Sequence, residues 1–319
     1  MTAASRPWQR YRVDPSDWTT WHHAGIGASE WGSVLGYNPH AGPHRVWRDK
    51  RGLSAPFDET EAMELGHEFE EIIVRRACAK LGVTVLDLHG QVCLERRDLA
   101  SWARATLDYI VETSDGPMVI ECKSTGQFIG PNDMPEPSWR FQLAAQQWVS
   151  GVERGAIAAL CPTRGGLGVR VWRRDFDPAL VAVAKPLLDQ FWALVESGVP
   201  PILDGSDDAE DTLRALYPRG TEGAVDLTDE TADMAREYDR ARQELADAEK
   251  AKNALGQRIK ESLGLAVEGR SGNVMVRWSN VVGRKGVDTA KLKAEFPEVF
   301  ETVAKTGEPT RRMTVMVGS

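Results

Sequence analysis

The alternation of apolar and polar residues divides the chain into three zones. Residues 1–203 mix tryptophans, glycine turns and short alternating apolar segments. That mixture predicts a compact α/β domain. Residues 204–228 follow two prolines and contain the polar, acidic stretch DGSDDAED, which predicts a linker.

Residues 229–319 make up the third zone, and its main predicted element is one long helix. Apolar residues recur there at three- and four-residue steps, at Met234, Tyr238, Ala241, Leu245, Ala248, Leu255 and Ile259. This spacing predicts an amphipathic helix that begins after an N-cap at Thr228 and ends at Gly264. Residues 273–282 and 311–317 are strand-like, and residues 288–296 predict a small helix. The third zone is therefore a small α+β extension, whose long helix we expect to pack on a surface or to pair.

A hairpin and two helices are predicted within the first zone. Residues 102–124 contain two apolar, β-branched segments on either side of a turn-forming cluster at 113–117, which predicts a β-hairpin. Residues 65–82 and 137–152 carry apolar residues at helical spacing, so we expect two helices that pack on a sheet.

Charge and cysteine spacing narrow the classes of function. The net charge is −8, whereas a protein that coats DNA with its whole surface is normally basic, so any DNA contact should be confined to a local groove. The four cysteines form no C-x-x-C pair, which argues against a zinc site or an iron–sulfur cluster and gives no reason to expect disulfides.

Two features of the sequence bear on the cellular compartment of the protein. No apolar run approaches the roughly 20 residues of a membrane helix, and the N-terminus lacks the apolar core of a secretory signal. We therefore expect a soluble, cytoplasmic protein with no membrane partner.

The strongest chemical signal lies in the hairpin. Side chains alternate along a strand, so Glu121 and Lys123 share one face, and Asp108 on the preceding strand can lie beside Glu121 across the ladder. Two carboxylates suit Mg²⁺ or Mn²⁺, and the backbone carbonyl of Cys122 could add an oxygen ligand. The lysine can orient a water or stabilise developing negative charge. Taken alone, the pattern is also common by chance, because strands often carry charged residues on their wet face.

Two further candidates lie on the predicted helices. Glu70 falls in the first or second turn of the helix at 65–82, where it could reach the metal pocket or merely favour the helix dipole. Gln142 lies on an otherwise apolar stripe and must find hydrogen-bond partners. It could hold a water or a phosphate, and a glutamine bonded within the core is an equal alternative.

Near the N-terminus, small residues precede an apolar, helix-like run. Gly25, Gly27 and Ser29 would let a phosphate approach the backbone at a helix start. The competing interpretation is a structural turn in which Ser29 or Ser33 caps the helix.

Together these segments resemble the phage recombination exonucleases of the lambda-exonuclease type, also called the YqaJ-like viral recombinase family, within the PD-(D/E)XK nucleases. The segments occur in the family's order: G-I-G-A-S-E at 25–30, L-G-H-E-F-E at 65–70, the Asp108 strand, E-C-K at 121–123 and Q-x-x-x-Q at 142–146. The resemblance covers roughly residues 18–195. It implies a mixed central sheet flanked by helices, with the active site at one sheet edge.

The resemblance also implies roles for individual residues. The implied metal ligands are Asp108, Glu121 and the backbone carbonyl of Cys122, and the catalytic set further includes Lys123, Glu70 and Gln142. The residues expected at DNA or its phosphates are Ser29, His22, Arg45 and Gln146, with Ser29 at the 5′ phosphate.

One position departs from the family pattern. An arginine usually precedes the G-I-G-x-S segment, and here that place holds His22 and His23. Arginine is a permanent bidentate phosphate clamp, whereas histidine is mostly neutral near pH 7. The sequence therefore matches the family pattern less well at the site for a terminal phosphate than at the hydrolytic centre. Arg45 or Arg48 could compensate for the missing arginine.

As a whole, the resemblance implies a Mg²⁺-dependent exonuclease that degrades double-stranded DNA from an end, 5′ to 3′, during phage-type recombination in the bacterial cytoplasm. It further implies a ring-like homotrimer and a single-strand annealing protein as partner. Two alternatives stay open: a structure- or site-selective endonuclease of the same superfamily, and a non-catalytic DNA-binding recombination scaffold.

Overall fold

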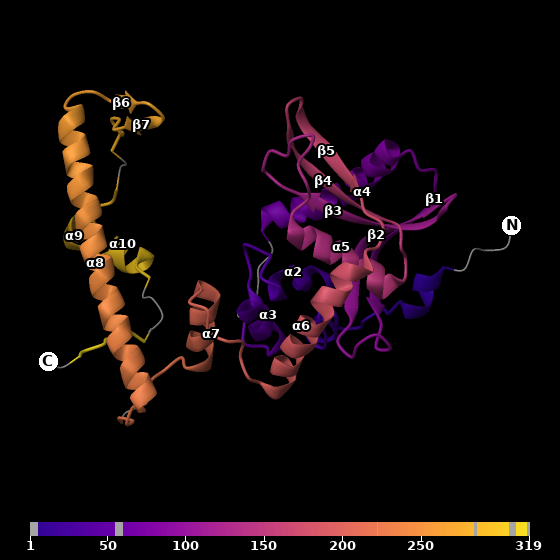
Figure 1. Ribbon diagram of the computed structural model, residues 1–319, viewed down its shortest axis with the longest axis horizontal. Coiled ribbons are helices and arrows are strands. Elements are labelled where there is room, and N and C mark those ends of the chain that lie inside the picture. Colours follow the sequence, from indigo (N-terminus) through magenta and orange to yellow (C-terminus); the bar gives the residue numbers. More distant parts are fainter. Residues whose placement is uncertain (1–5, 55–59, 222, 284–285, 306–310, 318–319) are drawn as a thin grey trace. The chain divides into compact units, whose positions relative to one another are not determined.

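The computed structural model describes residues 6–54, 60–221, 223–283, 286–305 and 311–317. The chain forms two compact units, Met1–Tyr217 and Pro218–Ser319, which are described separately below (Figure 1). In the described part of the chain, the first unit contains a five-stranded sheet and the second a two-stranded one.

The large sheet follows the order of its strands along the chain: β1 (Val85–Glu95), β2 (Arg104–Thr113), β3 (Gly116–Ser124), β4 (Gly155–Thr163) and β5 (Gly166–Arg173). Strands β3 and β4 run parallel, and the other neighbouring pairs are antiparallel. The predicted hairpin at 102–124 is confirmed as β2 and β3. The mixed sheet and its flanking helices confirm the predicted α/β fold.

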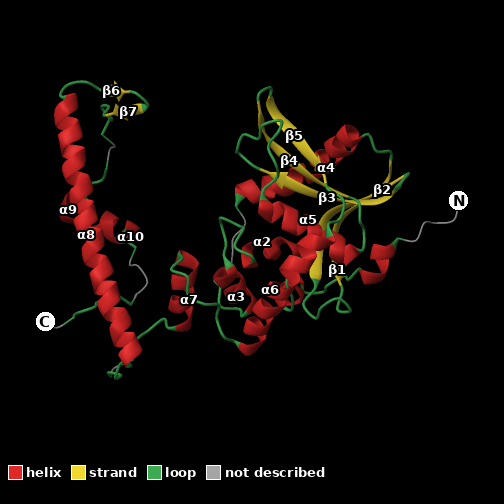
Figure 2. Ribbon diagram, in the orientation of Figure 1, coloured by secondary structure: helices red, strands yellow, loops and turns green. Residues whose placement is uncertain are grey.

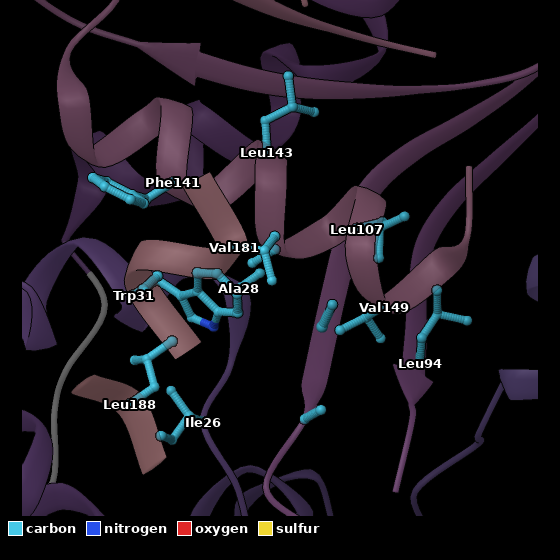
Figure 3. Close-up of a cluster of buried hydrophobic side chains, with 14 of the residues drawn as sticks. Ile26, Ala28, Trp31, Leu94, Leu107, Phe141, Leu143, Val149, Val181 and Leu188 are labelled. Carbon is cyan, nitrogen blue, oxygen red and sulfur yellow. The ribbon is translucent and has the colours of Figure 1, made fainter. Parts of the chain in front are cut away.

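Helices cover both faces of this sheet (Figure 2). Helix α4 (Glu61–Leu81) packs on one face, where its buried residues meet Met118 and Ile120. Helices α5 (Pro137–Ser150) and α6 (Pro178–Ser197) belong to the larger core on the other face. Part of that core is shown in Figure 3 and includes Ile26, Trp31, Leu94, Leu107, Phe141, Leu143, Val149, Val181 and Leu188. Burial on both faces explains why β2 to β4 are so apolar.

The N-terminal segment is fixed beside the start of β2. It contains η1 (Pro7–Tyr11), α1 (Trp18–His23), η2 (Ala28–Glu30), α2 (Trp31–Val34) and α3 (Pro43–Lys50). The Ile26 amide donates to the Trp102 carbonyl at 2.8 Å, and the Arg104 amide donates to the Ile26 carbonyl at 3.3 Å. The Trp31 ring packs edge-on against Trp102 and Trp148, with centroids 6.2 and 5.6 Å apart. The G-I-G-A-S-E motif is thereby held against the strand that carries Asp108.

Helix α6 corrects one expectation from the sequence. By length and composition it is apolar enough to span a membrane. Its residues Val181, Ala184, Leu188, Phe191 and Val195 are nevertheless buried in the main core. The Trp102 indole also donates to Asp189 on this helix at 2.9 Å. Packing in a protein core therefore explains part of its apolar character, while Val183 and Leu187 remain exposed.

The acidic stretch expected to be a linker contains a packed helix, α7 (Asp207–Leu216). Its acidic residues lie in the first turn, where the helix dipole favours negative charge. The buried Arg48 guanidinium donates to the Asp208 carbonyl at 2.8 Å. The Asp208 carboxylate in turn accepts from the Gly42 amide at 2.7 Å. These bonds fix α7 to the region of α3, and the first unit extends to Tyr217.

The second unit begins with the predicted long helix, α8 (Asp229–Leu263). Both predicted ends are confirmed: the Thr228 side chain accepts from the Thr231 amide, and Gly264 follows the last turn. Strands β6 (Glu268–Ser271) and β7 (Val274–Arg277) pair with each other, and α9 (Thr289–Glu295) and α10 (Pro297–Val303) follow. The strand expected at 311–317 was wrong, because these residues have no regular structure and pair with no described strand.

The anchoring of α7 can be tested by Arg48→Met. This change removes the hydrogen bond from Arg48 to the Asp208 carbonyl and the ion pair with the Asp208 carboxylate, so the free energy of unfolding should fall by about 2 kcal/mol, the typical cost of a lost charged hydrogen bond. Chemical denaturation monitored by circular dichroism measures this. Arg45→Met is the matched control, because Arg45 makes only a 3.4 Å bond to the His40 carbonyl. Equal stability of the two variants would contradict the assignment.

Candidate active site

The site is centred where the ladder between β2 and β3 ends. The last residue pair in register is Tyr109 with Ile120, so Asp108 and Glu121 come next on their strands. One oxygen of the Asp108 carboxylate accepts a hydrogen bond from the Cys122 amide at 2.7 Å. The side chain of Asp108 thus supplies an acceptor that the main chain of β2 no longer provides. Strand β3 continues beside β4 as far as Ser124.

Glu121 is almost completely buried, with 1% of its side chain exposed, and both of its oxygens are engaged. One lies 2.7 Å from the Lys123 ammonium, and the other accepts from the Gln146 amide at 2.5 Å. The Lys123 ammonium also donates to Gln142 at 2.8 Å. The two glutamines lie one turn apart on α5, so they face the strand together. The structure therefore brings Gln142 and Gln146 to the carboxylate–lysine pair.

Glu70 approaches from the opposite face of the sheet. Cys122 packs against α4, as the predicted alternation requires, and its thiol lies 3.7 Å from the Glu70 carbonyl. The Glu70 carboxylate is 2.8 Å from the His67 ring. Because α4 already begins at Glu61, Glu70 lies in mid-helix and not in the first or second turn. Its position is therefore not explained by the helix dipole.

Burial and mutual repulsion shift the protonation of this cluster. The pKa of Asp108 lies well above its usual value because the carboxyl is buried, and the Glu121 charge raises it further. Burial acts to lower the pKa of Lys123, but the Glu121 and Asp108 carboxylates outweigh it and raise the pKa. Burial and the same carboxylates raise the pKa of the Cys122 thiol, which stays neutral. The cluster is an acidic pair that a cation would relieve.

The donors present fit a hard divalent cation. No group of three or more His, Cys, Asp or Glu side chains that could hold a metal occurs among the residues that the structure describes. Mg²⁺, however, is commonly bound through one or two carboxylates and keeps several waters. Burial raises the pKa of Asp108, and the nearby Glu121 charge raises it further. Asp108, Glu121 and the Cys122 carbonyl therefore suit Mg²⁺ or Mn²⁺ and do not suit a closed zinc site.

Two of the expected phosphate-binding residues line a neighbouring cavity. Its volume is about 120 Å³, and it is lined by Trp18, Trp21, His22, Gly27, Ala28, Ser29, Arg104 and Thr106. Burial, together with the charge of Lys50, lowers the pKa of His22 to about 3, so the ring is neutral. His22 therefore does not supply the charge of the arginine that it replaces.

The other expected phosphate contacts lie elsewhere. Arg45 is bonded to the His40 carbonyl and does not line the cavity. Arg48 is occupied by α7, so it cannot compensate for the missing arginine. Gln146 belongs to the carboxylate cluster.

The alternative of a serine cap on α2 is wrong. Helix α2 has Glu30 at its N-cap, with no side-chain cap bond, and Ser33 accepts from Asn38 at 2.9 Å. The Gly27 amide is occupied by the Glu30 carboxylate at 2.7 Å. The backbone at the start of this segment is therefore already partly satisfied from within.

Sequence reasoning missed Arg104, which lines the cavity from the start of β2. Its side chain is only 4% exposed. A signal existed in the sequence, since a charged residue begins an otherwise apolar strand four residues before Asp108. Its distance from the G-I-G-A-S-E motif along the chain concealed the connection.

Part of the first unit matches a known protein family. Residues 17–153 match the family model described as the YqaJ-like viral recombinase domain. The chain is also 28% identical over 303 residues to the uncharacterized protein YqaJ of Bacillus subtilis (strain 168), which covers 91% of this chain and 90% of that protein. Residues 17–153 are therefore similar to the YqaJ-like viral recombinase domain, and the resemblance predicted from the motifs is confirmed.

Solved structures of two exonucleases are similar over part of the chain. The alkaline exonuclease LHK-Exo from Laribacter hongkongensis has a TM-score of 0.42 and 16% identity, covering 58% of this chain and 94% of that chain. A phage-related exonuclease from Haemophilus somnus 129PT has a TM-score of 0.40 and 11% identity, covering 57% of this chain and 98% of that chain.

The buried link made by Gln146 can be tested by Gln146→Leu. The substitution removes the donor to Glu121 and to the Thr106 carbonyl, so the free energy of unfolding should fall by about 2 kcal/mol. Gln142→Leu is the matched control one turn away, because Gln142 is partly exposed and accepts from Lys123 alone. Thermal unfolding of both variants in chelator measures the difference. A Gln146→Leu protein as stable as the wild type would refute the link.

Proposed function

We propose that this protein is a metal-dependent exonuclease that hydrolyses phosphodiester bonds of double-stranded DNA from an end, 5′ to 3′. The observation that carries the proposal is the convergence of Asp108, Glu121 and Lys123 at the end of the β2–β3 ladder. Its position inside a viral recombinase domain supports DNA as the substrate and recombination as the process. We place this activity in the cytoplasm of a bacterial host.

Asp108, Glu121 and the Cys122 carbonyl would hold Mg²⁺ or Mn²⁺. When bound, such an ion supplies Lewis-acid polarisation of the scissile phosphate. The excess negative charge of the buried acids supports this assignment, because both carboxylates can ionise more readily once a cation is shared between them. Gln146 fixes the orientation of Glu121 from α5.

Lys123 is the group that would stabilise charge on the reacting phosphate. Its raised pKa keeps the ammonium protonated, and about a quarter of its side chain, 24%, is exposed. A preformed cation in a partly dry site stabilises developing negative charge more strongly than one in water. Gln142 accepts from this ammonium and holds it beside Glu121. Glu70, on the far side of Asp108, adds negative charge as an accessory acid.

Digestion of linear duplex DNA tests the proposal directly. Asp108→Asn and Glu121→Gln should abolish Mg²⁺-dependent loss of linear DNA, because each removes a charged ligand. Lys123→Met should slow it by about 10²- to 10³-fold, the usual cost of losing one charge-stabilising group. Glu112→Gln is the matched control, since Glu112 is a buried acid on the same strand whose partners are Trp8 and Arg6. Release of nucleotides from end-labelled DNA is measured with Mg²⁺ and with chelator.

Closed circular DNA in the same assay separates the alternatives. An end-dependent enzyme leaves circles intact. Cutting of circles would move the protein to the endonuclease class. Binding of DNA without cleavage of either substrate would favour a recombination scaffold.

For the second unit, we propose a role in self-association. The stripe on α8 predicted from the sequence is exposed in the chain, with Leu245 64% and Leu255 59% exposed, and its burial against other copies would stabilise an oligomer. A ring-like trimer is the state that we expect from the resemblance. The same stripe could instead receive a single-strand annealing protein.

The double variant Leu245→Glu/Leu255→Glu in the full chain tests this role. Charge on the stripe should shift the solution mass toward the monomer, because buried carboxylates are costly. Gln243→Glu/Ala254→Glu places two equal charges on the opposite side of α8 and should leave the mass unchanged. Light scattering after size-exclusion chromatography gives the mass. An identical mass for wild type and both variants would remove the stripe from assembly.

A further inference from the structure

Arg104 is a buried cation whose hydrogen-bond donors are only partly satisfied. Its side chain is 4% exposed, and among the described residues its Nε and Nη1 atoms have no hydrogen-bond partner. Buried donors are nearly always paired, and a charged donor is the most costly to leave unpaired. The arrangement therefore indicates that an acceptor is supplied from outside the chain.

The nearest carboxylate only partly compensates this charge. Glu95 lies 3.4 Å from Arg104 Nε, but it also accepts from the Trp21 indole at 3.0 Å and pairs with Arg97. One carboxylate is thus shared between two arginines. Burial lowers the pKa of Arg104, yet an arginine remains protonated near neutral pH.

The backbone nearby is shaped to receive the guanidinium. A Cβ atom at Gly25 would overlap Arg104 Nη1 and would lie 2.6 Å from the Trp102 carbonyl oxygen. Only glycine therefore fits at the first position of the G-I-G-A-S-E motif. The Arg104 guanidinium therefore packs directly against the backbone of the motif, although the two are far apart in the sequence.

The cavity beside Arg104 has the chemistry of an anion site. The hydroxyl-bearing residues Ser29 and Thr106 line it, and no acidic residue of the described part of the chain does. The closest acid of the motif, Glu30, is neutralised by Lys50 at 2.7 Å. The volume of about 120 Å³ is several times the roughly 10–15 Å³ that one water requires, so a small oxyanion can enter.

This cavity is tied to the candidate active site. Thr106 precedes Asp108 by two residues on β2. The Gln146 amide donates both to the Thr106 carbonyl at 3.2 Å and to the Glu121 carboxylate at 2.5 Å. A single side chain thus joins the wall of the cavity to the acidic pair.

We propose that Arg104 binds a phosphate group of the DNA substrate in this cavity and supplies the permanent charge that His22 lacks. The inference rests on the proposed nuclease function. Its ligand is a phosphate, either the terminal 5′ monoester or a diester within the strand. The monoester is favoured, because it offers three free oxygens to the guanidinium and the two hydroxyls.

The test compares duplexes that differ only in a 5′ phosphate or a 5′ hydroxyl. Wild type, Arg104→Gln and Arg104→Lys are measured for hydrolysis with Mg²⁺ and for binding in chelator by fluorescence anisotropy. Arg97→Gln is the matched control, because Arg97 shares Glu95 but is exposed and does not line the cavity. Wild type and Arg97→Gln should prefer the phosphorylated end by about ten- to a hundredfold, the worth of a charged hydrogen-bond pair.

Arg104→Gln should bring that ratio close to one. Arg104→Lys should lie between, since lysine keeps the charge without the planar fork. Equal weakening on both duplexes relative to Arg97→Gln would assign the bound group to an internal diester and would still support the proposal. Wild-type cleavage of both ends without preference, matched by all variants, would overturn it while leaving the exonuclease function intact.

Failure of the proposed nuclease function can be distinguished from failure of the proposal for Arg104. If wild type cleaves no DNA, binding in chelator still reports on Arg104 through the same ratio. If Arg104→Gln does not fold, the proposal is tested with Arg104→Lys and by competition. In the competition experiment, inorganic phosphate should displace the phosphorylated duplex from the wild-type protein. An absence of competition together with an unchanged ratio in Arg104→Lys would overturn the proposal.

Discussion

The hydrogen bond from the Cys122 amide to the Asp108 carboxylate is the interaction on which the site depends. It occurs one step beyond the last β2–β3 pair, so a carboxylate replaces the main chain as acceptor at the end of the ladder. Beyond this point β2 stays paired with β1, and β3 stays paired with β4 as far as Ser124. Glu121 therefore stays in a rigid strand while Asp108 meets it from the other side. This geometry opens a polar site between two inner strands, where the β2–β3 ladder ends, and not at the sheet edge expected from the resemblance.

Such a site costs stability, and the surrounding helices limit that cost. Two carboxylates are held together in a largely buried position, which raises the pKa of Asp108. The Lys123 ammonium and the two glutamines of α5 offset part of the repulsion. They do not remove it, and the side-chain oxygen of Gln146 is buried with no hydrogen-bond partner among the described residues. A fold under selection for stability alone would place apolar residues here, so the retained strain is an argument for function.

Local patterns predicted much of the structure. Period-two alternation placed Glu121 and Cys122 on opposite faces, and capping residues marked both ends of α8, because these features depend only on neighbours along the chain. The start of α4 and the packing of α7 were not predictable in this way. Helix α7 depends on Arg48, which is distant in sequence. The apolar pattern at 311–317 lacked a partner strand, and alternation alone does not form a sheet.

The role of Arg104 illustrates the same limit at the site. A histidine in place of a family arginine suggested a weakened phosphate clamp, and the sequence directed attention to cations on α3. The structure instead places a guanidinium from β2 in the cavity, in space left by Gly25. This also bears on the net charge of −8. A desolvated arginine interacts with a phosphate in a low dielectric and is little screened by salt. An acidic protein can therefore engage DNA through a few buried contacts at an end, without a basic surface along the duplex.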